Sequence, residues 1–120
     1  MDPHQRLVLE VGYDALFKSG FDQASLLGCQ IGVFVGFALV TGWGLVRRDA
    51  GKEPNPYTNL GADSAAVAGR LSYLLGLKGP CFTLNTACSS ALVALDCAGL
   101  SLRLGRCQHA VVAGVNLQLH

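Results

Sequence analysis

The sequence is short of charged residues: Asp, Glu, Lys and Arg make up 14% of its 120 residues, against roughly 25% in a typical soluble domain. Hydrophobic residues make up 51%, which supplies a core and excludes a disordered chain. Because so little charge is available for the surface, we expect part of that surface to be covered by further chain or by a partner. The sequence therefore predicts a single domain that is one part of a larger structure.

The sequence also lacks a basic cluster. Its nine Lys and Arg residues are scattered and the net charge is only +1, which excludes the electrostatic footprint of a nucleic-acid-binding protein. Arg47 and Arg48 stand side by side, and we expect them to be a solvated pair in a loop. We expect no nucleic-acid partner.

No long hydrophobic run is present. The most apolar window, residues 31–46, is interrupted by glycines and Thr41 and is shorter than the ~20 residues of a membrane-spanning helix. No basic stretch followed by an apolar one opens the sequence, so no secretory signal is visible. These absences predict a cytoplasmic protein with no membrane partner.

Metal-binding and disulfide patterns are missing as well. The five cysteines are an odd number, with no C-x-x-C spacing and no nearby histidine that would complete a zinc site. We expect reduced thiols, no metal and no cofactor, and we expect four of the five to be small core residues. The five are Cys29, Cys81, Cys88, Cys97 and Cys107.

Three segments have helical patterns. Asp2 can cap a helix that begins at Pro3, and Gly20 suits its end, so the pattern predicts a helix over 3–19. Apolar residues at helical spacing predict a second helix over 63–75. A third is predicted over 88–104, where Gly105 would end it.

Three short apolar segments read as strands. Residues 31–35 are rich in β-branched side chains and predict a strand covered on both faces, 81–84 predict a short strand, and 110–115 predict a final buried strand. Residues 37–59 carry several glycines and prolines and should be mostly irregular, although their length also suits a functional, variable or partly helical segment. The alternation of helix and strand predicts an α/β layered domain with a mixed or parallel sheet.

Cys88 lies in the segment NTACSSA, where a predicted strand gives way to a predicted helix. A thiol at the start of a helix lies beside unpaired backbone N–H groups and the positive end of the helix dipole, which favour the thiolate form. The same N–H groups can stabilise the oxyanion that forms when a thioester is attacked. Spacing alone leaves another interpretation open, in which Cys88 is a buried small residue or stands in for Ser89 as a helix cap.

Several motifs occur together, in one order, across nearly the whole chain. They are DP-x-QR at the first helix, GVFVG at the first strand, RLSY in the second helix, a GP turn, TACSS, and AGVNL at the last strand. With these motifs the sequence closely resembles the β-ketoacyl synthase family, specifically the ketosynthase domains of modular polyketide synthases.

The resemblance implies a thiolase-like fold, a layered α-β-α-β-α sandwich of two related halves, with residues 1–120 as the middle of the first half. It implies that Cys88 is the catalytic nucleophile, which takes an acyl chain from the thioester of an acyl carrier protein. A decarboxylative Claisen condensation with a malonyl-type extender would follow. It further implies that the full-length parent is a homodimer.

The family's two catalytic histidines lie in later motifs that His4, His109 and His120 do not match, so we expect them outside this segment. Asn85 stands where the family usually has Asp, which keeps the acceptor oxygen and removes the charge. Trp43 is also unusual at its position, and it either lines a different acyl path or packs on the surface, the second being favoured.

Two other functions stay open. One is a catalytically silent ketosynthase-like module that acts as a scaffold or dimerisation unit, although silent members commonly replace the cysteine. The other is a thiolase-type or redox-sensing cysteine protein, which the residues around Cys88 disfavour.

Overall fold

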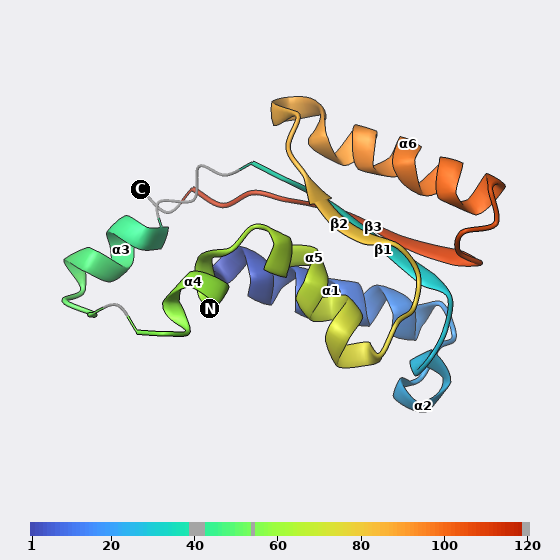
Figure 1. The fold of residues 1–120 in the computed structure, drawn as a ribbon, viewed down its shortest axis with the longest axis horizontal. Helices are drawn as coiled ribbons and strands as arrows, with labels where there is room; N and C mark the ends of the chain where they lie inside the picture. Colours follow the sequence, from blue (N-terminus) through green and yellow to red (C-terminus); the bar gives the residue numbers. More distant parts are fainter. Residues whose placement is uncertain (39–42, 54, 119–120) are drawn as a thin grey trace.

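The computed structural model describes residues 1–38, 43–53 and 55–118 (Figure 1). The elements, in chain order, are α1 (Pro3–Lys18), α2 (Gln23–Leu26), β1 (Ile31–Phe37), α3 (Trp43–Asp49), α4 (Thr58–Ala62), α5 (Ala65–Leu75), β2 (Cys81–Leu84), the 3₁₀ turn η1 (Ala87–Ser89), α6 (Ser90–Arg103) and β3 (His109–Val115). The predicted alternation of helices and strands is therefore confirmed.

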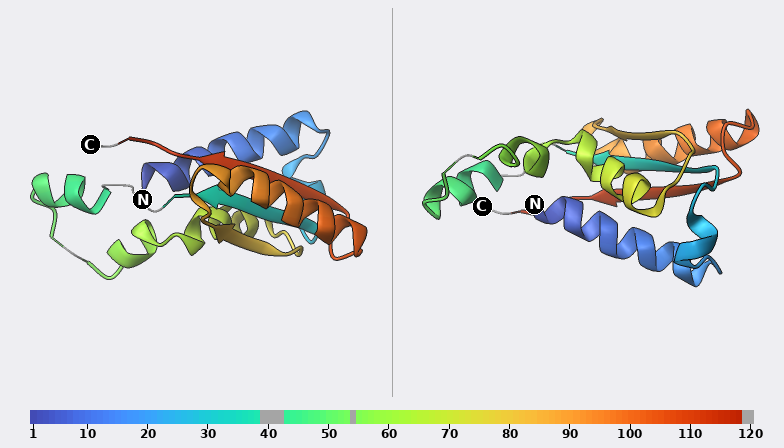
Figure 2. Two further views of the ribbon diagram at one scale, coloured as in Figure 1. Left: turned by 90° about the horizontal axis from the view of Figure 1, so that it is seen from above. Right: turned by 60° about the horizontal axis from the view of Figure 1, so that its bottom comes forward.

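The three strands form one parallel sheet in the order β2-β1-β3. Helices α1 and α5 cover one face and α6 covers the other, so the molecule has three layers, as Figures 1 and 2 show. The connection from β1 to β2 passes over the first face, and the connection from β2 to β3 crosses back over the second. Because all strands run in the same direction, their carboxyl ends lie along one edge of the sheet.

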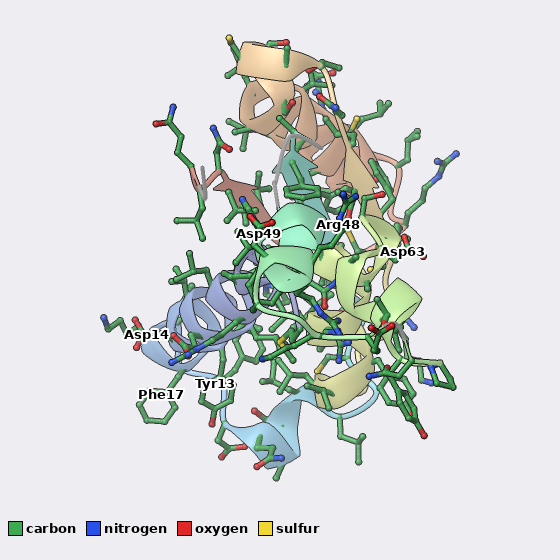
Figure 3. All side chains as sticks on the ribbon, turned by 90° about the vertical axis from the view of Figure 1, so that its left-hand side faces the viewer. Tyr13, Asp14, Phe17, Arg48, Asp49 and Asp63 are labelled. Atoms are coloured by element: carbon green, nitrogen blue, oxygen red, sulfur yellow. The ribbon has the colours of Figure 1, made fainter. Side chains whose placement is uncertain are left out.

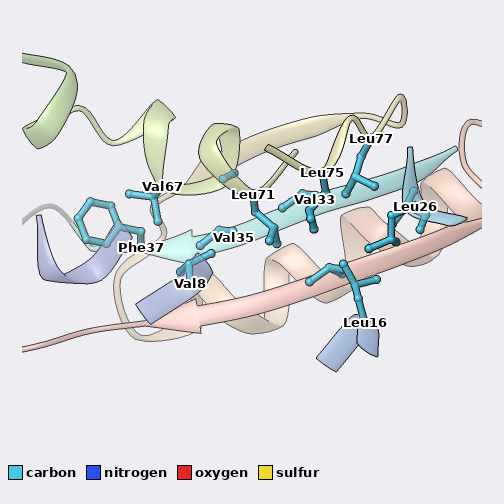
Figure 4. Packing of buried hydrophobic residues seen from close by; sticks show 13 residues of the cluster. Val8, Leu16, Leu26, Val33, Val35, Phe37, Val67, Leu71, Leu75 and Leu77 are labelled. Carbon is cyan, nitrogen blue, oxygen red and sulfur yellow. The ribbon is translucent and has the colours of Figure 1, made fainter. Parts of the chain in front are cut away.

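Strand β1 is the centre of the core, and all seven of its residues are buried. Its alternate side chains point to opposite faces. Val33 and Val35 meet Leu71 and other apolar residues of the helices on the α1/α5 face (Figure 4), whereas Phe34 packs with Ala94 and its neighbours below α6. The predicted strand over 31–35 is confirmed and extends to Phe37.

Strand β3 differs from the prediction of a buried strand, because Val111 is its only fully buried residue. The strand lies at an edge of this three-stranded sheet, so only one side of it is paired. Its first residue, His109, is exposed and packs its ring edge-on against Phe21 at 5.3 Å between centroids. His109 is therefore a surface residue.

The DP-x-QR motif begins α1 and also ties it to a distant part of the chain. The Asp2 carboxylate accepts a hydrogen bond from a backbone N–H of the first turn, and proline occupies the first position. The Gln5 side chain donates to the carbonyl groups of Leu60 and Asp63 and accepts from Arg70 Nε at 2.6 Å. Gln5 therefore links α1 to α4 and α5.

Among the interpretations of residues 37–59, the partly helical one is confirmed, because the segment contains the helix α3 and the start of α4. Arg47 and Arg48 lie in the last turn of α3, where basic side chains suit the helix dipole, and not in a loop. Gly42 and Pro54, which are among the glycines and prolines of this segment, lie outside the described residues. The sequence analysis also missed α2, which Asp22 and Ser25 begin with a reciprocal capping box.

Across the described ranges, no helix is both long enough and apolar enough to cross a membrane.

Candidate active site

A cavity of about 490 Å³ opens at the carboxyl ends of β1 and β3, beside the start of α6. In parallel α/β sheets, ligands bind at this edge of the sheet. Cys88 is exposed and lies on the wall of the cavity. The cavity is lined by Gly36, Ala38, Ala87, Cys88, Ser90, Ala91, Gly114, Val115 and Asn116.

A tight turn carries Cys88 from β2 to α6. The Asn85 side chain accepts a hydrogen bond from the N–H of Ala87 at 3.0 Å, so the acceptor oxygen that the sequence analysis noted is used. Ala87 has φ of +56°, and among the described residues it is the only one other than glycine with a positive φ. A left-handed alanine is strained by roughly 1–2 kcal/mol, and the hydrogen bonds of the turn must offset this cost.

The predicted helix start at Cys88 is two residues too early. Ala87–Ser89 form a 3₁₀ turn, and α6 begins at Ser90. The reason is that serine and threonine hydroxyls hold the backbone in the tighter turn. Ser89 Oγ donates to the carbonyl of Thr86 at 2.8 Å, and Ser90 Oγ donates to the carbonyl of Ala87 at 2.7 Å.

Ser90 is the residue that locks this turn, because it is buried and its hydroxyl makes two hydrogen bonds. Besides donating to Ala87, its oxygen accepts from the N–H of Thr86 at 2.8 Å. The hydrogen bonds of the turn join Asn85, Thr86, Ala87, Ser89 and Ser90 to one another, and none of them uses the Cys88 thiol. The turn thus fixes the backbone of Cys88 and leaves its sulfur available.

Two paired glycines let the turn approach the sheet. Gly36 of β1 and Gly114 of β3 are neighbours in the register. A Cβ added at Gly36 would lie 2.5 Å from the carbonyl carbon of Ser90, and one at Gly114 would lie 2.7 Å from Ala91 Cβ. The start of α6 therefore rests directly on these glycines. Sequence analysis did not assign them this role, although both occur in the motifs GVFVG and AGVNL.

One protein family matches the whole length of this sequence. The family described as "Beta-ketoacyl synthase, N-terminal domain" matches residues 1–120. The chain belongs to the β-ketoacyl synthase family.

Relatives of this β-ketoacyl synthase chain include much longer proteins. It is 45% identical over 120 residues to the highly reducing polyketide synthase dmxL2 of Cryptosporiopsis sp. (strain 8999), covering 100% of this chain and 5% of that protein. It is 42% identical over 119 residues to the fatty acid synthase of Anser anser anser, covering 99% of this chain and 34% of that protein. The chain therefore spans a small part of these relatives.

Solved ketosynthase structures confirm the predicted α/β, thiolase-like fold. The ketosynthase from module 6 of the bacillaene synthase of Bacillus subtilis 168 superposes with a TM-score of 0.84 at 32% identity. The match covers 100% of this chain and 19% of that chain, so the β-ketoacyl synthase chain described here corresponds to part of the ketosynthase fold.

The other cysteines of this β-ketoacyl synthase chain are less buried than predicted. Cys107 is buried against the core below α6, but Cys29 and Cys97 are half-buried and Cys81 is exposed. The prediction of four core cysteines is wrong for Cys81, because β2 lies at an edge of this sheet. Exposure to solvent therefore distinguishes Cys88 from Cys29, Cys97 and Cys107, but it does not distinguish Cys88 from Cys81.

The Cys81 thiol gives a prediction about pH. Although the residue as a whole is exposed, the atoms packed around its sulfur desolvate the thiol and raise the pKa of Cys81, and a hydrogen bond with Ser72 only partly opposes this. Because the thiolate is the reactive form, we expect alkylation of Cys81 by iodoacetamide to be slow at pH 7 and to rise about tenfold per pH unit to beyond pH 9. Peptide mass spectrometry across pH 6–10 measures this rate. A plateau below pH 8 would contradict the expected direction.

The two hydrogen bonds of the Ser90 hydroxyl give a second prediction. We expect Ser90→Ala to lower the free energy of unfolding by about 1–2 kcal/mol, because the N–H of Thr86 would lose its buried acceptor. Ser89→Ala is the matched control: its hydroxyl is exposed, and we expect a loss below about 0.5 kcal/mol. Urea denaturation of both variants compares them. Equal losses in the two variants would show that Ser90 does not lock the turn.

Trp43 does not line the cavity of Cys88. It is half-buried in α3 and lines a different cavity of about 370 Å³ together with Arg47, Arg48 and Lys52. Figure 3 shows Arg48 and Asp49 on this helix. Among the alternatives for Trp43, packing near the surface agrees better with its position than an acyl path from Cys88.

His109 does not line the cavity of Cys88. His109 begins β3 and so lies at the opposite end of that strand from Gly114 and Asn116. His120 lies outside the described residues. Within the ranges that the structure describes, no group of three His, Cys, Asp or Glu side chains could hold a metal ion.

Proposed function

We propose that residues 1–120 are the cysteine-bearing part of a ketosynthase domain, and that Cys88 is its acyl-accepting nucleophile. The observation that carries the proposal is the position of the thiol: it is exposed, on the wall of a cavity at the carboxyl edge of the sheet, just before the first turn of α6. α6 has 14 residues and no acidic residue in its first turn, so its N-terminal end can stabilise the negative charge that develops on an attacked carbonyl oxygen.

In the loading step, the Cys88 thiolate attacks the carbonyl carbon of an acyl thioester on a carrier protein. A bond forms between Cys88 Sγ and the acyl carbon, the bond to the carrier sulfur breaks, and the carrier thiolate leaves and takes up a proton. Backbone N–H groups at the start of α6 stabilise the negative charge on the carbonyl oxygen. The turn residues Asn85 and Ser90 hold the backbone for this role.

In the condensation step, a malonyl-type extender on the carrier loses carbon dioxide, and the resulting carbanion attacks the acyl group on Cys88. A carbon–carbon bond forms, the bond to Cys88 Sγ breaks, and the free cysteine is restored. The parent protein would act in the cytoplasm as a homodimer, with an acyl carrier protein as its partner, and its histidines would lie outside residues 1–120.

Mass spectrometry of the parent synthase tests the loading step. The protein is incubated with an acyl-carrier thioester, digested with trypsin and searched for the mass of the acyl group. Cleavage after Lys78 and Arg103 places Cys81, Cys88 and Cys97 on one peptide, so fragmentation must locate the added mass. We expect it on Cys88. Acyl mass on another cysteine would overturn the assignment, and no acyl mass at all would favour the silent scaffold.

A further inference from the structure

His4 is fully buried at the start of α1, and three contacts hold its ring. Nδ1 lies 2.6 Å from Asp2 Oδ1, and the backbone N–H of Leu117 donates to Nε2 at 2.9 Å. The ring packs edge-on against Phe37, with 5.0 Å between centroids. The imidazole therefore joins α1 to the ends of both β1 and β3.

These contacts determine which nitrogen carries the proton. The Leu117 N–H is a donor, so Nε2 must offer its lone pair, and the proton lies on Nδ1, which donates to Asp2. The same Asp2 oxygen also accepts the backbone N–H of His4 at 2.8 Å. The carboxylate that caps α1 thus also orients the ring toward Leu117.

Two of the three residues that the His4 ring contacts, Phe37 and Leu117, lie next to the wall of the Cys88 cavity. Phe37 ends β1 and precedes Ala38, and Leu117 follows Asn116; both Ala38 and Asn116 line the cavity. Leu117 lies two residues beyond the last paired residue of β3, so the sheet ladder does not hold it.

We propose that His4 is a positioning residue for this cavity, which fixes the wall formed by Ala38 and Asn116 next to Cys88. The inference rests on the proposed function. A phenylalanine at this position would fill a similar volume, but the Leu117 N–H would lose its acceptor and the Asp2 carboxylate would keep only the backbone N–H of residue 4. The imidazole therefore makes two hydrogen bonds that an apolar core residue of the same size cannot make.

Hydrogen–deuterium exchange tests the contact independently of catalysis. In the parent synthase we expect the Leu117 amide, resolved by fragmentation, to exchange at least about tenfold more slowly than an unstructured amide. His4→Phe should remove this protection, whereas His4→Gln should retain it, because its side-chain oxygen can accept at the place of Nε2. Exchange of the Leu117 amide at the unstructured rate in the wild-type protein would overturn the proposal.

The rate of acyl loading on Cys88 tests the functional consequence. We expect loading to fall about tenfold in His4→Phe and less than about threefold in His4→Gln. Leu16→Val, at the other end of α1, is the control for a loss of stability: its melting temperature should fall while its loading rate stays near that of the wild type. Equal loading by His4→Phe and the wild type, or equally slow loading by both His4 variants, would overturn the proposal.

A failure of the proposed function and a failure of the inference about His4 give different experimental results. If the wild-type parent carries no acyl group on Cys88, the proposed function fails, and the exchange of the Leu117 amide still shows whether His4 holds the strand end.

Discussion

Cys88→Ala is expected to abolish acyl loading of the parent synthase, with a loss of more than about a thousandfold, because Cys88 has the one thiol among the residues that line the cavity. Cys88→Ser should be nearly as inactive, since a serine hydroxyl is a much weaker nucleophile than a cysteine thiol. Cys88 is exposed and its thiol makes no hydrogen bond in the turn, so the melting temperature of both variants should stay close to that of the wild type. Radiolabelled acyl transfer and thermal unfolding measure the two effects.

Cys81→Ala is the matched control for this experiment. Like Cys88, Cys81 is exposed, and it lies on the strand that leads to the turn, but it does not line the cavity. We expect Cys81→Ala to load at the wild-type rate. Retention of loading in Cys88→Ala, or its loss in Cys81→Ala, would show that the nucleophile has been misassigned.

The order of helices and strands could be predicted because periodicity and helix caps are local signals. Asp2 and Pro3 begin α1 as expected, and the β-branched run after Gln30 forms the central strand. Boundaries and burial were predicted less well, since they depend on contacts between distant residues. The exposure of Cys81 and the partial exposure of most of β3 follow from the position of both strands at the edges of the sheet, which no local pattern shows.

The candidate site was predicted in part for the same reason. The segment NTACSSA marks the strand-to-helix turn, so Cys88 could be singled out from the sequence. The positive φ of Ala87 and the hydrogen bonds by which Ser90 holds the turn could not be predicted from the sequence. The hydroxyl of Ser90 also suits an ordinary helix cap. The contact of His4 with Leu117 spans 113 residues, and only the folded chain brings the two together.

Gly36 and Gly114 allow the start of α6, and with it the turn that carries Cys88, to lie directly against the sheet. An alanine at Gly36 would place its Cβ 2.5 Å from the carbonyl carbon of Ser90 and 2.6 Å from the nitrogen of Ala91. These are backbone atoms, so no side-chain rotation can relieve the clash. The start of α6, with the turn that carries Cys88, must move away from the sheet.

We therefore expect Gly36→Ala to lower the free energy of unfolding by about 2–3 kcal/mol. We also expect it to slow acyl loading about a hundredfold, because small displacements of a reacting group have effects of this size. Gly69→Ala is the control, since Gly69 lies inside α5 with no atom within 4 Å of an added Cβ. That variant should gain about 0.5–1 kcal/mol from its higher helix propensity and load normally. Urea denaturation and loading rates compare the two, and a Gly36→Ala variant as stable and active as Gly69→Ala would show that α6 does not rest on the strand as closely as described.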